Sequence, residues 1–275
     1  MLEISKIKKA TYYYQKKEAI DREKKDQPIL EEIRKIFNKN YKKYGYIRVT
    51  LALREKGYKI NKKRVYRIMK ENNLKAAVTR KKYKSYRGER GVRVDNLLEQ
   101  KFISNRPYEK MGTDLSQFTT PYGKLYVSPI IDFNTREILA YDVSTKPDFT
   151  QIKRMLKMLE IRHGKKLKAA IIQSDQGWQY RMKYYQKFIK EQGMIQSMSR
   201  KGNCLDNSPT ENFFGRMKEE MYYGKEHEYK SIEDLKKAVE KYIKYYNNER
   251  IVNRLKTSPI KYKGMFYNEK NYDTL

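Results

Sequence analysis

The sequence is poor in the residues that build disulfides and zinc sites. Its 275 residues include one cysteine, Cys204, and two histidines, His163 and His227. A single cysteine excludes an internal disulfide and fits a reducing compartment. Three such side chains are too few for a zinc finger, a zinc protease or a zinc deaminase. Long apolar runs are also missing: none approaches the ~20 residues of a membrane-spanning helix. The N-terminus has no apolar signal segment, so we expect a soluble, cytoplasmic protein.

Acidic residues are few compared with basic ones. The chain has 63 Lys and Arg against 33 Asp and Glu, a formal net charge of +30. More than half of this excess falls in the first hundred residues. A charge of this size predicts a polyanionic partner, with double-stranded DNA as the first candidate. Hydrophobic residues still make up 39% of the chain, and its length allows one core domain plus a smaller module.

The N-terminal region predicts three helices. The first begins with Asp26 as its cap, the second runs from Tyr46 to Lys56 and ends at Gly57, and the third has Asn61 as its cap. A short turn between the last two is typical of a helix-turn-helix. The outer face of the third helix would enter the major groove, and its predicted DNA-binding residues are Lys63, Arg64, Arg67 and Lys70.

A basic linker should follow, because residues 75–93 are polar and lack apolar periodicity. We expect Lys81 and Lys82 to lie against DNA phosphates. Beyond the linker, the pattern changes to strands. One surrounds Asp114, two more are joined by a turn at 132–135, and a fourth ends at Ser174 and Asp175. A helix ending at Gly193, a fifth strand and a long helix from Ser231 complete a mixed α/β sheet layered with helices.

The stretch "NSPTENFF" has two readings. Ser208 as an N-cap, Pro209 at the first helical position and Glu211 three residues after the cap form a capping box. Alternatively, Glu211 joins Asp114, which lies in or at the end of the first predicted strand, and Asp175, which follows the fourth, at one edge of the sheet. An all-oxygen set of this kind selects Mg²⁺ or Mn²⁺, and two such ions suit phosphoryl transfer. The residues alone leave both readings open.

Several motifs together resemble a known family. "KKYGYIRVTLALREKGYKINKKRVYRIMKENNL", "TDLSQF", "SDQGWQY", "NCLDNSPTENFFGRMKEE" and "YYNNERIVNRLKTSPIKY" occur in this order. They are similar to the DDE transposases of the IS-three insertion-sequence family, whose core is like that of retroviral integrases. The resemblance implies an RNase H-like mixed five-stranded sheet layered with helices, preceded by an all-α helix-turn-helix domain. It divides the chain into a helix-turn-helix region at 1–76, a basic linker at 77–103 and a catalytic core at 104–268.

The resemblance also implies a function. The expected enzyme is a Mg²⁺-dependent transposase that binds terminal inverted repeats, cleaves 3′ ends and transfers strands. Asp114, Asp175 and Glu211 would be its catalytic and metal-binding residues, with two Mg²⁺ ions that Mn²⁺ can replace. Lys201 and Arg216 flank the triad and would either neutralise substrate phosphates or be plain surface charge. Asn207, next to the helix start, would either orient the site or cap the helix. Met111 and Gln173 stand where the family often has Trp and His, and we expect altered packing there.

The resemblance extends to partners and location. It implies self-association on DNA and a bacterial, nucleoid-associated location. The chain is expected to be the product of a second reading frame, with the product of the upstream frame as a further partner. Two alternatives remain at this stage. A tyrosine recombinase is suggested only by 26 tyrosines and the basic character. A catalytically inactive DNA-binding protein or repressor would explain the N-terminal third and leave the carboxylates without a role.

Overall fold

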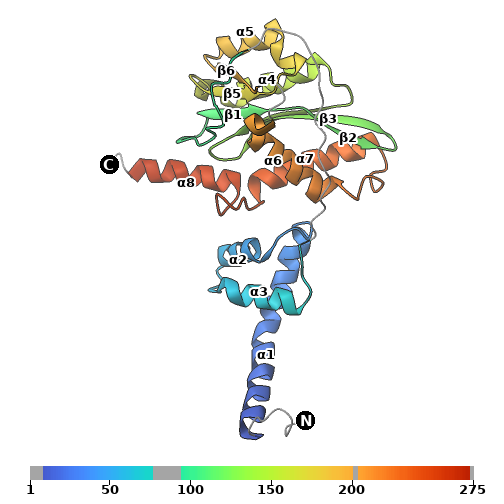
Figure 1. Ribbon diagram of the computed structural model, residues 1–275, viewed down its shortest axis with the longest axis vertical. Helices are drawn as coiled ribbons and strands as arrows, with labels where there is room; N and C mark the ends of the chain where they lie inside the picture. Colours follow the sequence, from blue (N-terminus) through green and yellow to red (C-terminus); the bar gives the residue numbers. More distant parts are fainter. Residues whose placement is uncertain (1–8, 77–93, 201–203, 273–275) are drawn as a thin grey trace. The chain divides into compact units, whose positions relative to one another are not determined.

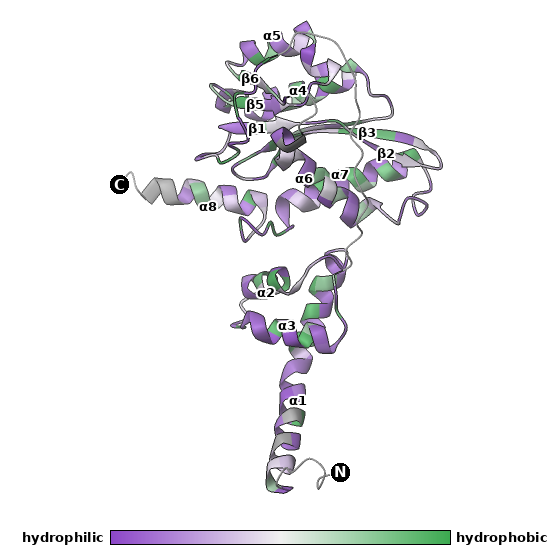
Figure 2. Ribbon diagram, viewed as in Figure 1, coloured by the Kyte–Doolittle hydropathy of each residue, from purple (hydrophilic) through white to green (hydrophobic). Residues whose placement is uncertain are grey.

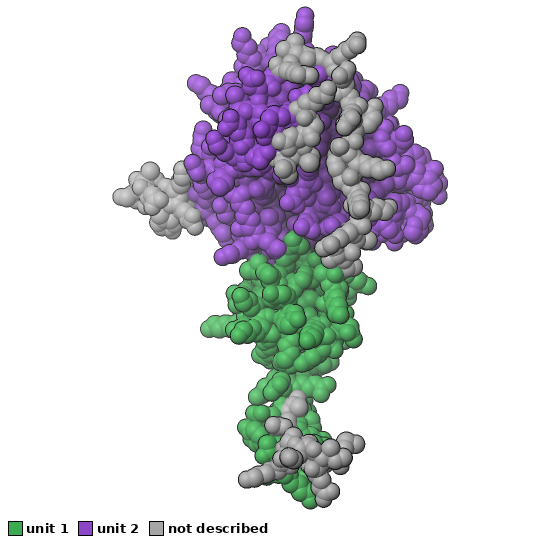
Figure 3. All heavy atoms as spheres, in the orientation of Figure 1, with its two compact units in different colours: residues 1–78 green, residues 79–275 purple. Residues whose placement is uncertain are grey.

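The computed structural model describes residues 9–76, 94–200 and 204–272. The chain divides into two compact units, residues 1–78 and 79–275 (Figure 3). Each unit has its own core and is described by itself. Lys81, Lys82, Lys201 and most of the expected linker lie outside the described residues.

The first unit consists of three helices (Figure 1). They are α1 (Lys9–Lys39), α2 (Tyr46–Glu55) and α3 (Lys62–Glu71). Gly57, in the turn after α2, has a φ of 89°, a left-handed conformation that glycine adopts without steric cost. The Asn61 side chain caps α3 by accepting a hydrogen bond of 2.8 Å from the Lys63 N–H. The predicted second and third helices are therefore confirmed. Their apolar stripes meet α1 in a core that includes Ile33, Val49, Leu53, Val65 and Ile68.

The predicted start of the first helix is wrong. Helix α1 begins at Lys9, and Asp26 lies inside it, as does Pro28. The Asp26 carboxylate is buried and binds Arg64 (2.8 Å) and Arg67 (2.5 Å) of α3. The Asp26 side chain, which the local sequence pattern assigns to a helix cap, therefore forms ion pairs with two arginines that are distant in the sequence.

The second unit is built on a six-stranded mixed sheet. Its strands are β1 (Lys110–Thr113), β2 (Ser116–Thr120), β3 (Gly123–Asp132), β4 (Ile138–Ser144), β5 (Ile171–Ser174) and β6 (Ile195–Met198). The hydrogen-bonded order is β2-β3-β1-β5-β6, and β4 pairs with β3. Strands β1, β5 and β6 are parallel, whereas β3 runs antiparallel to β1, β2 and β4. The mixed sheet is confirmed, with one strand more than predicted.

The additional strand arises because the first predicted strand is interrupted at Asp114 and Leu115. Both β1 and β2 pair with β3, and the register on either side places Pro129 opposite Asp114. A proline has no backbone N–H to give to a ladder. The Leu115 N–H donates instead to the Asp114 side chain at 2.7 Å. The interruption therefore falls at one of the predicted catalytic residues.

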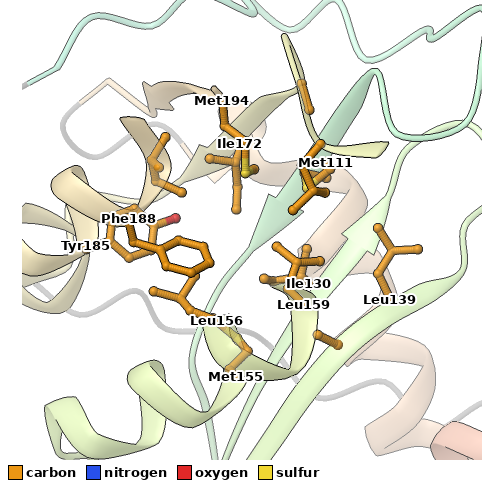
Figure 4. Packing of buried hydrophobic residues seen from close by; sticks show 14 of the residues in the cluster. Met111, Ile130, Leu139, Met155, Leu156, Leu159, Ile172, Tyr185, Phe188 and Met194 are labelled. Carbon is orange, nitrogen blue, oxygen red and sulfur yellow. The ribbon is translucent and has the colours of Figure 1, made fainter. Parts of the chain in front are cut away.

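Helices cover both faces of the sheet (Figure 1). On one face lie α4 (Phe149–His163) and α5 (Lys183–Glu191), and on the other lie α6 (Ser208–Met217) and α7 (Ile232–Asn248). Figure 4 shows the core beneath α4 and α5, where apolar side chains at helical spacing meet the strands. Its members include Met111, Ile130, Leu139, Met155, Leu156, Leu159, Ile172, Tyr185 and Phe188. Met111 packs fully in this core.

Shorter elements and the C-terminal helix complete the unit. The 3₁₀ turns are η1 (Gly164–Lys166), η2 (Trp178–Arg181) and η3 (Cys204–Asn207), and a π-helical segment, η4 (Lys218–Tyr222), continues α6. Helix α8 (Pro259–Tyr272) was not predicted. Ser231 caps α7 as expected, accepting from the Asp234 N–H at 3.0 Å. The coloring in Figure 2 shows hydrophobic and hydrophilic residues mixed along the described helices, and none of these helices could span a membrane.

Candidate active site

Asp114 and Asp175 lie side by side at the ends of neighbouring parallel strands. Met111 pairs with Ile172 and Gly112 with Gln173, so the register, extended by two residues, sets Asp114 beside Asp175. Adjacent strands are about 4.8 Å apart, which brings the two carboxylates within direct electrostatic reach. The Asp175 side chain accepts the Gly177 N–H at 2.9 Å, which fixes it at the start of the following turn. The predicted convergence at the strand ends is therefore observed for these two residues.

Glu211 reaches the same region from the first turn of α6. This helix packs against β1 at Gly112, where a Cβ atom would lie 2.5 Å from the Thr210 Oγ1 atom. Only a residue without a side chain permits that approach. The Asn207 amide holds the helix start by donating to the Thr113 carbonyl at 3.3 Å, next to Asp114. Gly112 and Asn207 thus set the distance between Glu211 and the strand ends.

The predicted capping box is wrong. Helix α6 begins at Ser208, so Asn207 takes the N-cap position, and no side-chain cap hydrogen bond forms there. The Asn207 amide is turned toward β1 instead of toward the helix. The capping reading of Glu211 is therefore not supported, and its reading as a member of the carboxylate group remains. The alternative reading of Asn207 as an orienting residue is the one that its hydrogen bond supports.

The three carboxylates perturb one another. Burial and then the charge of Asp175 raise the pKa of Asp114 to about 8, and Glu211 adds to this effect. Burial raises the pKa of Asp175 as well. The pKa of Glu211 is raised by burial and by the charge of Asp175. Such mutual repulsion among half-buried acids is typical of functional sites, because a purely structural cluster would be neutralised by bases.

The carboxylates do not form a closed metal cage by themselves. In the described part of the chain, no three His, Cys, Asp or Glu side chains are grouped closely enough to hold a metal ion. The donor chemistry nevertheless fits a hard divalent cation, since all three side chains offer carboxylate oxygens and the charge of Asp175 raises the pKa of both Asp114 and Glu211. Asp114 and Asp175 stand on rigid strand ends, whereas Glu211 is a longer side chain on a helix.

Two residues that sequence reasoning missed adjoin the carboxylates. Lys218 lies two helical turns after Glu211, and its charge lowers the pKa of Asp114 against the larger opposing effects. Its ammonium group stands 5.1 Å from the centre of the Phe118 ring. The fully buried Tyr180 hydroxyl is 3.5 Å from the Thr113 Oγ1 atom, and burial and then Asp114 raise its pKa. The seven-residue spacing from Glu211 could have indicated Lys218, but no local pattern distinguishes Tyr180.

Comparison with known proteins agrees with this geometry. Residues 23–83 match the model of an HTH-like domain, and residues 104–204 and 211–267 match models of an integrase core domain. The chain is 43% identical over 271 residues to a protein named as the transposase InsK for insertion sequence element IS150 of Escherichia coli. That alignment covers 97% of this chain and 93% of the relative. The chain belongs to the insertion-sequence transposases.

Two further matches agree with this assignment. The transposase is 49% identical over 222 residues to a transposase-like protein of Haemophilus influenzae, covering 80% of this chain and all of the relative. Its fold is similar to a chain in the intasome of simian T-cell lymphotropic virus, solved in complex with PP2A regulatory subunit B56 gamma. The TM-score is 0.50 at 12% identity, over 84% of this chain and 74% of that chain. The RNase H-like integrase core and the preceding helical domain are therefore confirmed, and the transposase is a DNA-cutting enzyme.

The predicted DNA-binding residues of the transposase differ in their surroundings. Lys63 and Lys70 are exposed on α3. Arg64 and Arg67 are turned toward α1, where they bind Asp26, and Arg67 also pairs with Glu71 at 3.1 Å. The two lysines are thus presented to solvent, whereas the two arginines take part in holding the helices together.

A buried ion pair anchors the segment that bears Lys218. Glu220, in η4, accepts hydrogen bonds from Arg250 at 2.5 and 2.8 Å and from the Tyr242 hydroxyl at 2.8 Å. Both charged side chains are only 3% exposed. The Tyr222 hydroxyl donates to the Thr119 carbonyl and accepts its N–H, which joins the end of η4 to β2. The π-helical segment therefore has a fixed position next to the site.

Proposed function

We propose that this transposase binds the terminal inverted repeats of its element, cleaves the 3′ ends with water and transfers the new 3′-OH to another phosphodiester. The observation that supports this most directly is the side-by-side placement of Asp114 and Asp175, with the pKa of Asp114 raised to about 8 by burial and by its neighbour. An acid pair in this state is suited to a divalent cation.

We assign the metal ligands as Asp114, Asp175 and Glu211. Bound Mg²⁺, or Mn²⁺ in its place, would supply Lewis acidity, and two such ions are the arrangement that suits phosphoryl transfer. Asp114 and Asp175 offer oxygens from the rigid sheet, and Glu211 closes the set from α6. Lys218, beside Asp114, is placed to neutralise a phosphate oxygen. The presence of all three carboxylates disfavours a catalytically inactive repressor.

DNA recognition belongs, in this proposal, to the helix-turn-helix region 1–76, and the chemistry to the core at 104–268, with 77–103 as the linker. Lys63 and Lys70 are the α3 residues best exposed to contact DNA. Arg64 and Arg67 would contact DNA only if they left, or shared, their ion pairs with Asp26. Lys81 and Lys82 remain proposed phosphate contacts. Joining two element ends requires at least two protomers on DNA, and the upstream reading-frame product is a further proposed partner.

The test is cleavage and joining of a labelled fragment that carries the element's own end, with Mg²⁺ or with EDTA. Glu211→Gln keeps the size of the side chain and removes its charge. We expect activity to fall on the order of 10³-fold, as for loss of a group that stabilises transition-state charge. Glu219→Gln is the matched control, because Glu219 lies on the same helical run and pairs with the exposed Arg216 at 3.0 Å. Equal activity of wild type and Glu211→Gln would remove Glu211 from the site.

A second readout follows metal binding without catalysis. Mn²⁺ should raise the thermal midpoint of the wild type and of Glu219→Gln, since a ligand that binds only the folded state stabilises it. The increase should be smaller in Glu211→Gln and smaller still in Asp114→Asn. If wild type binds Mn²⁺ but does not cut, the upstream reading-frame segment is the component to add.

A further inference from the structure

The first described residues of the second unit are fastened to β6, a strand at the edge of the sheet. The Met198 N–H donates to the Asp95 carbonyl at 3.3 Å, and the Leu97 N–H donates to the Ser197 Oγ atom at 2.9 Å. Leu98 is only 2% exposed. An edge strand presents backbone groups that lack a neighbouring strand, and this segment takes up one of them. The segment is therefore held on the sheet by both backbone and side chains.

A strained turn follows in the same segment. The Lys101 N–H donates to the Leu98 carbonyl at 2.7 Å, which closes the turn. The two residues between them, Glu99 and Gln100, have φ values of 45° and 65°. Glycine, asparagine and aspartate usually occupy such positions, because other side chains crowd the backbone there. Strain of this kind persists only where the surrounding structure holds it in place, and it gathers at functional sites.

The Gln100 side chain forms a hydrogen bond with Asp206, a residue of η3. Its Nε2 atom donates to the Asp206 Oδ1 atom at 3.0 Å. Arg200 donates to the same carboxylate through its backbone N–H at 2.9 Å and through its guanidinium group at 3.0 Å. The Asp206 side chain is fully buried, whereas that of Arg200 is 61% exposed. Arg200 is six residues from Asp206, so that pair is local, but Gln100 is 106 residues away and ties Asp206 to another segment.

Asp206 is joined directly to the start of the helix that carries Glu211. The next residue, Asn207, precedes α6, and Glu211 lies in the first turn of that helix. The Asn207 amide donates to the Thr113 carbonyl at 3.3 Å, which is long for a hydrogen bond of this type. In the described part of the chain, the buried Asn207 Oδ1 atom has no hydrogen-bond partner. Asn207 alone therefore holds the helix start weakly, and the contacts of Asp206 add a second hold.

We propose that Gln100 is a positioning residue for the reaction: its hydrogen bond to Asp206 fixes the start of α6 and, through it, the Glu211 carboxylate. Gln100 acts through Asp206 and not on the reacting atoms. The strained turn has a purpose in this arrangement, because it belongs to the residue whose amide reaches Asp206. The inference rests on the proposed function, since Glu211 contributes to the reaction as one of the three carboxylates.

The first experiment measures hydrogen exchange of the backbone amides in buffer without DNA or metal. The test variant is Gln100→Met, which keeps an unbranched side chain of similar length and removes the donor. We expect the α6 amides to exchange roughly tenfold faster, because a hydrogen bond to a charged group is lost. Unchanged exchange in α6 would overturn the proposal.

Gln192→Met is the matched control for this experiment. The Gln192 Nε2 atom also donates to a carboxylate at 3.0 Å, that of Glu160 in α4. Its loss should accelerate exchange in α4 and at the end of α5 and leave α6 at the wild-type rate. If Gln100→Met accelerates α4 and α5 as much as α6, or if the control accelerates α6 equally, the effect is general destabilisation and the proposal is wrong.

A second experiment asks whether Gln100 acts through Glu211. At saturating DNA with Mg²⁺, Gln100→Met should cleave about tenfold more slowly, while duplex affinity measured in EDTA stays at the wild-type value. In the Glu211→Gln background, Gln100→Met should cause little further loss, because the group that it positions is already replaced. Losses that multiply in the double variant would show a role independent of Glu211 and overturn the proposal.

The two experiments also separate this inference from the proposed function. If the wild type does not cleave with any divalent metal, the proposed function is at fault. Hydrogen exchange needs neither DNA nor metal, so it still decides whether Gln100 holds the start of α6.

Discussion

Glu211 and Glu220 lie on one continuous helical run, yet their surroundings are opposite. Glu220 is buried with Arg250 and the Tyr242 hydroxyl, and every charge in that cluster has a partner. Glu211 is half-buried among acids, with Asp175 as the charge that raises its pKa. Within a few turns of helix, the same residue type therefore has a structural role in one place and a proposed chemical role in the other. What distinguishes them is whether the neighbouring charge is neutralised within the chain.

The largest expected effect comes from removing one member of the buried Glu220–Arg250 ion pair. Arg250→Ala leaves Glu220 buried without its positively charged partner and should destabilise the protein by about 3–5 kcal/mol. Urea unfolding of the full chain measures this. Replacing both residues with methionine should recover much of the loss, because an apolar pair of similar size avoids the unpaired charge. If Arg250→Ala unfolds at the same urea concentration as the wild type, the pair is not structural.

A smaller loss of stability should follow from displacing α6, the helix that carries Glu211. In Gly112→Ala the new Cβ atom would meet Thr210 at 2.5 Å and the Phe133 ring at 2.6 Å, so α6 must shift away from β1. Overpacking of this kind costs about 1–3 kcal/mol, and strand cleavage should decrease further than stability does. Gly215→Ala is the control, since its Cβ would meet nothing within 4 Å. That variant should be stabilised by up to about 1 kcal/mol and remain active.

A third effect has the opposite sign and depends on pH. The pKa of Asp114 is about 8 in the folded chain against an ordinary 3.8, so the folded state binds an extra proton between these values. Its contribution to stability is therefore present at low pH and is lost as pH rises toward 8. In EDTA, Asp114→Asn should melt above the wild type at pH 8, by a margin that shrinks toward pH 5. A margin independent of pH would contradict the raised pKa.

Asp206 supplies a control for the pH experiment. Its pKa is lowered to about 2 by the hydrogen bond from Arg200, so its contribution is present above the ordinary value of 3.8 and is lost as pH falls through about 2. Asp206→Asn should therefore lower the melting temperature by the same amount from pH 5 to pH 8. Asp114 and Asp206 together test whether an acid beside other acids and an acid paired with arginine give opposite dependences of stability on pH.

Sequence pattern was sufficient for the parts of the fold that depend on local order. Apolar periodicity and turn residues identified α2, α3, α7 and the strands, apart from the break between β1 and β2, and they placed Asp175 after a strand and Asp114 in or at the end of one. The sequence pattern gave the wrong role for side chains whose hydrogen-bond partner is distant in the sequence. Asp26 and Asn207 both have cap-forming side chains, but one binds arginines of another helix and the other binds a strand carbonyl. Tyr180 likewise can be placed beside the carboxylates only from its contact with Thr113, which is far away along the chain.

The interruption between β1 and β2 has a practical consequence. The Leu115 N–H has the Asp114 carboxylate as its acceptor, at 2.7 Å, in place of a carbonyl of the neighbouring strand. Any change of charge on that carboxylate must therefore alter the magnetic environment of a single backbone amide. In a ¹⁵N-labelled sample, the Leu115 resonance would therefore report proton binding and cation binding at Asp114.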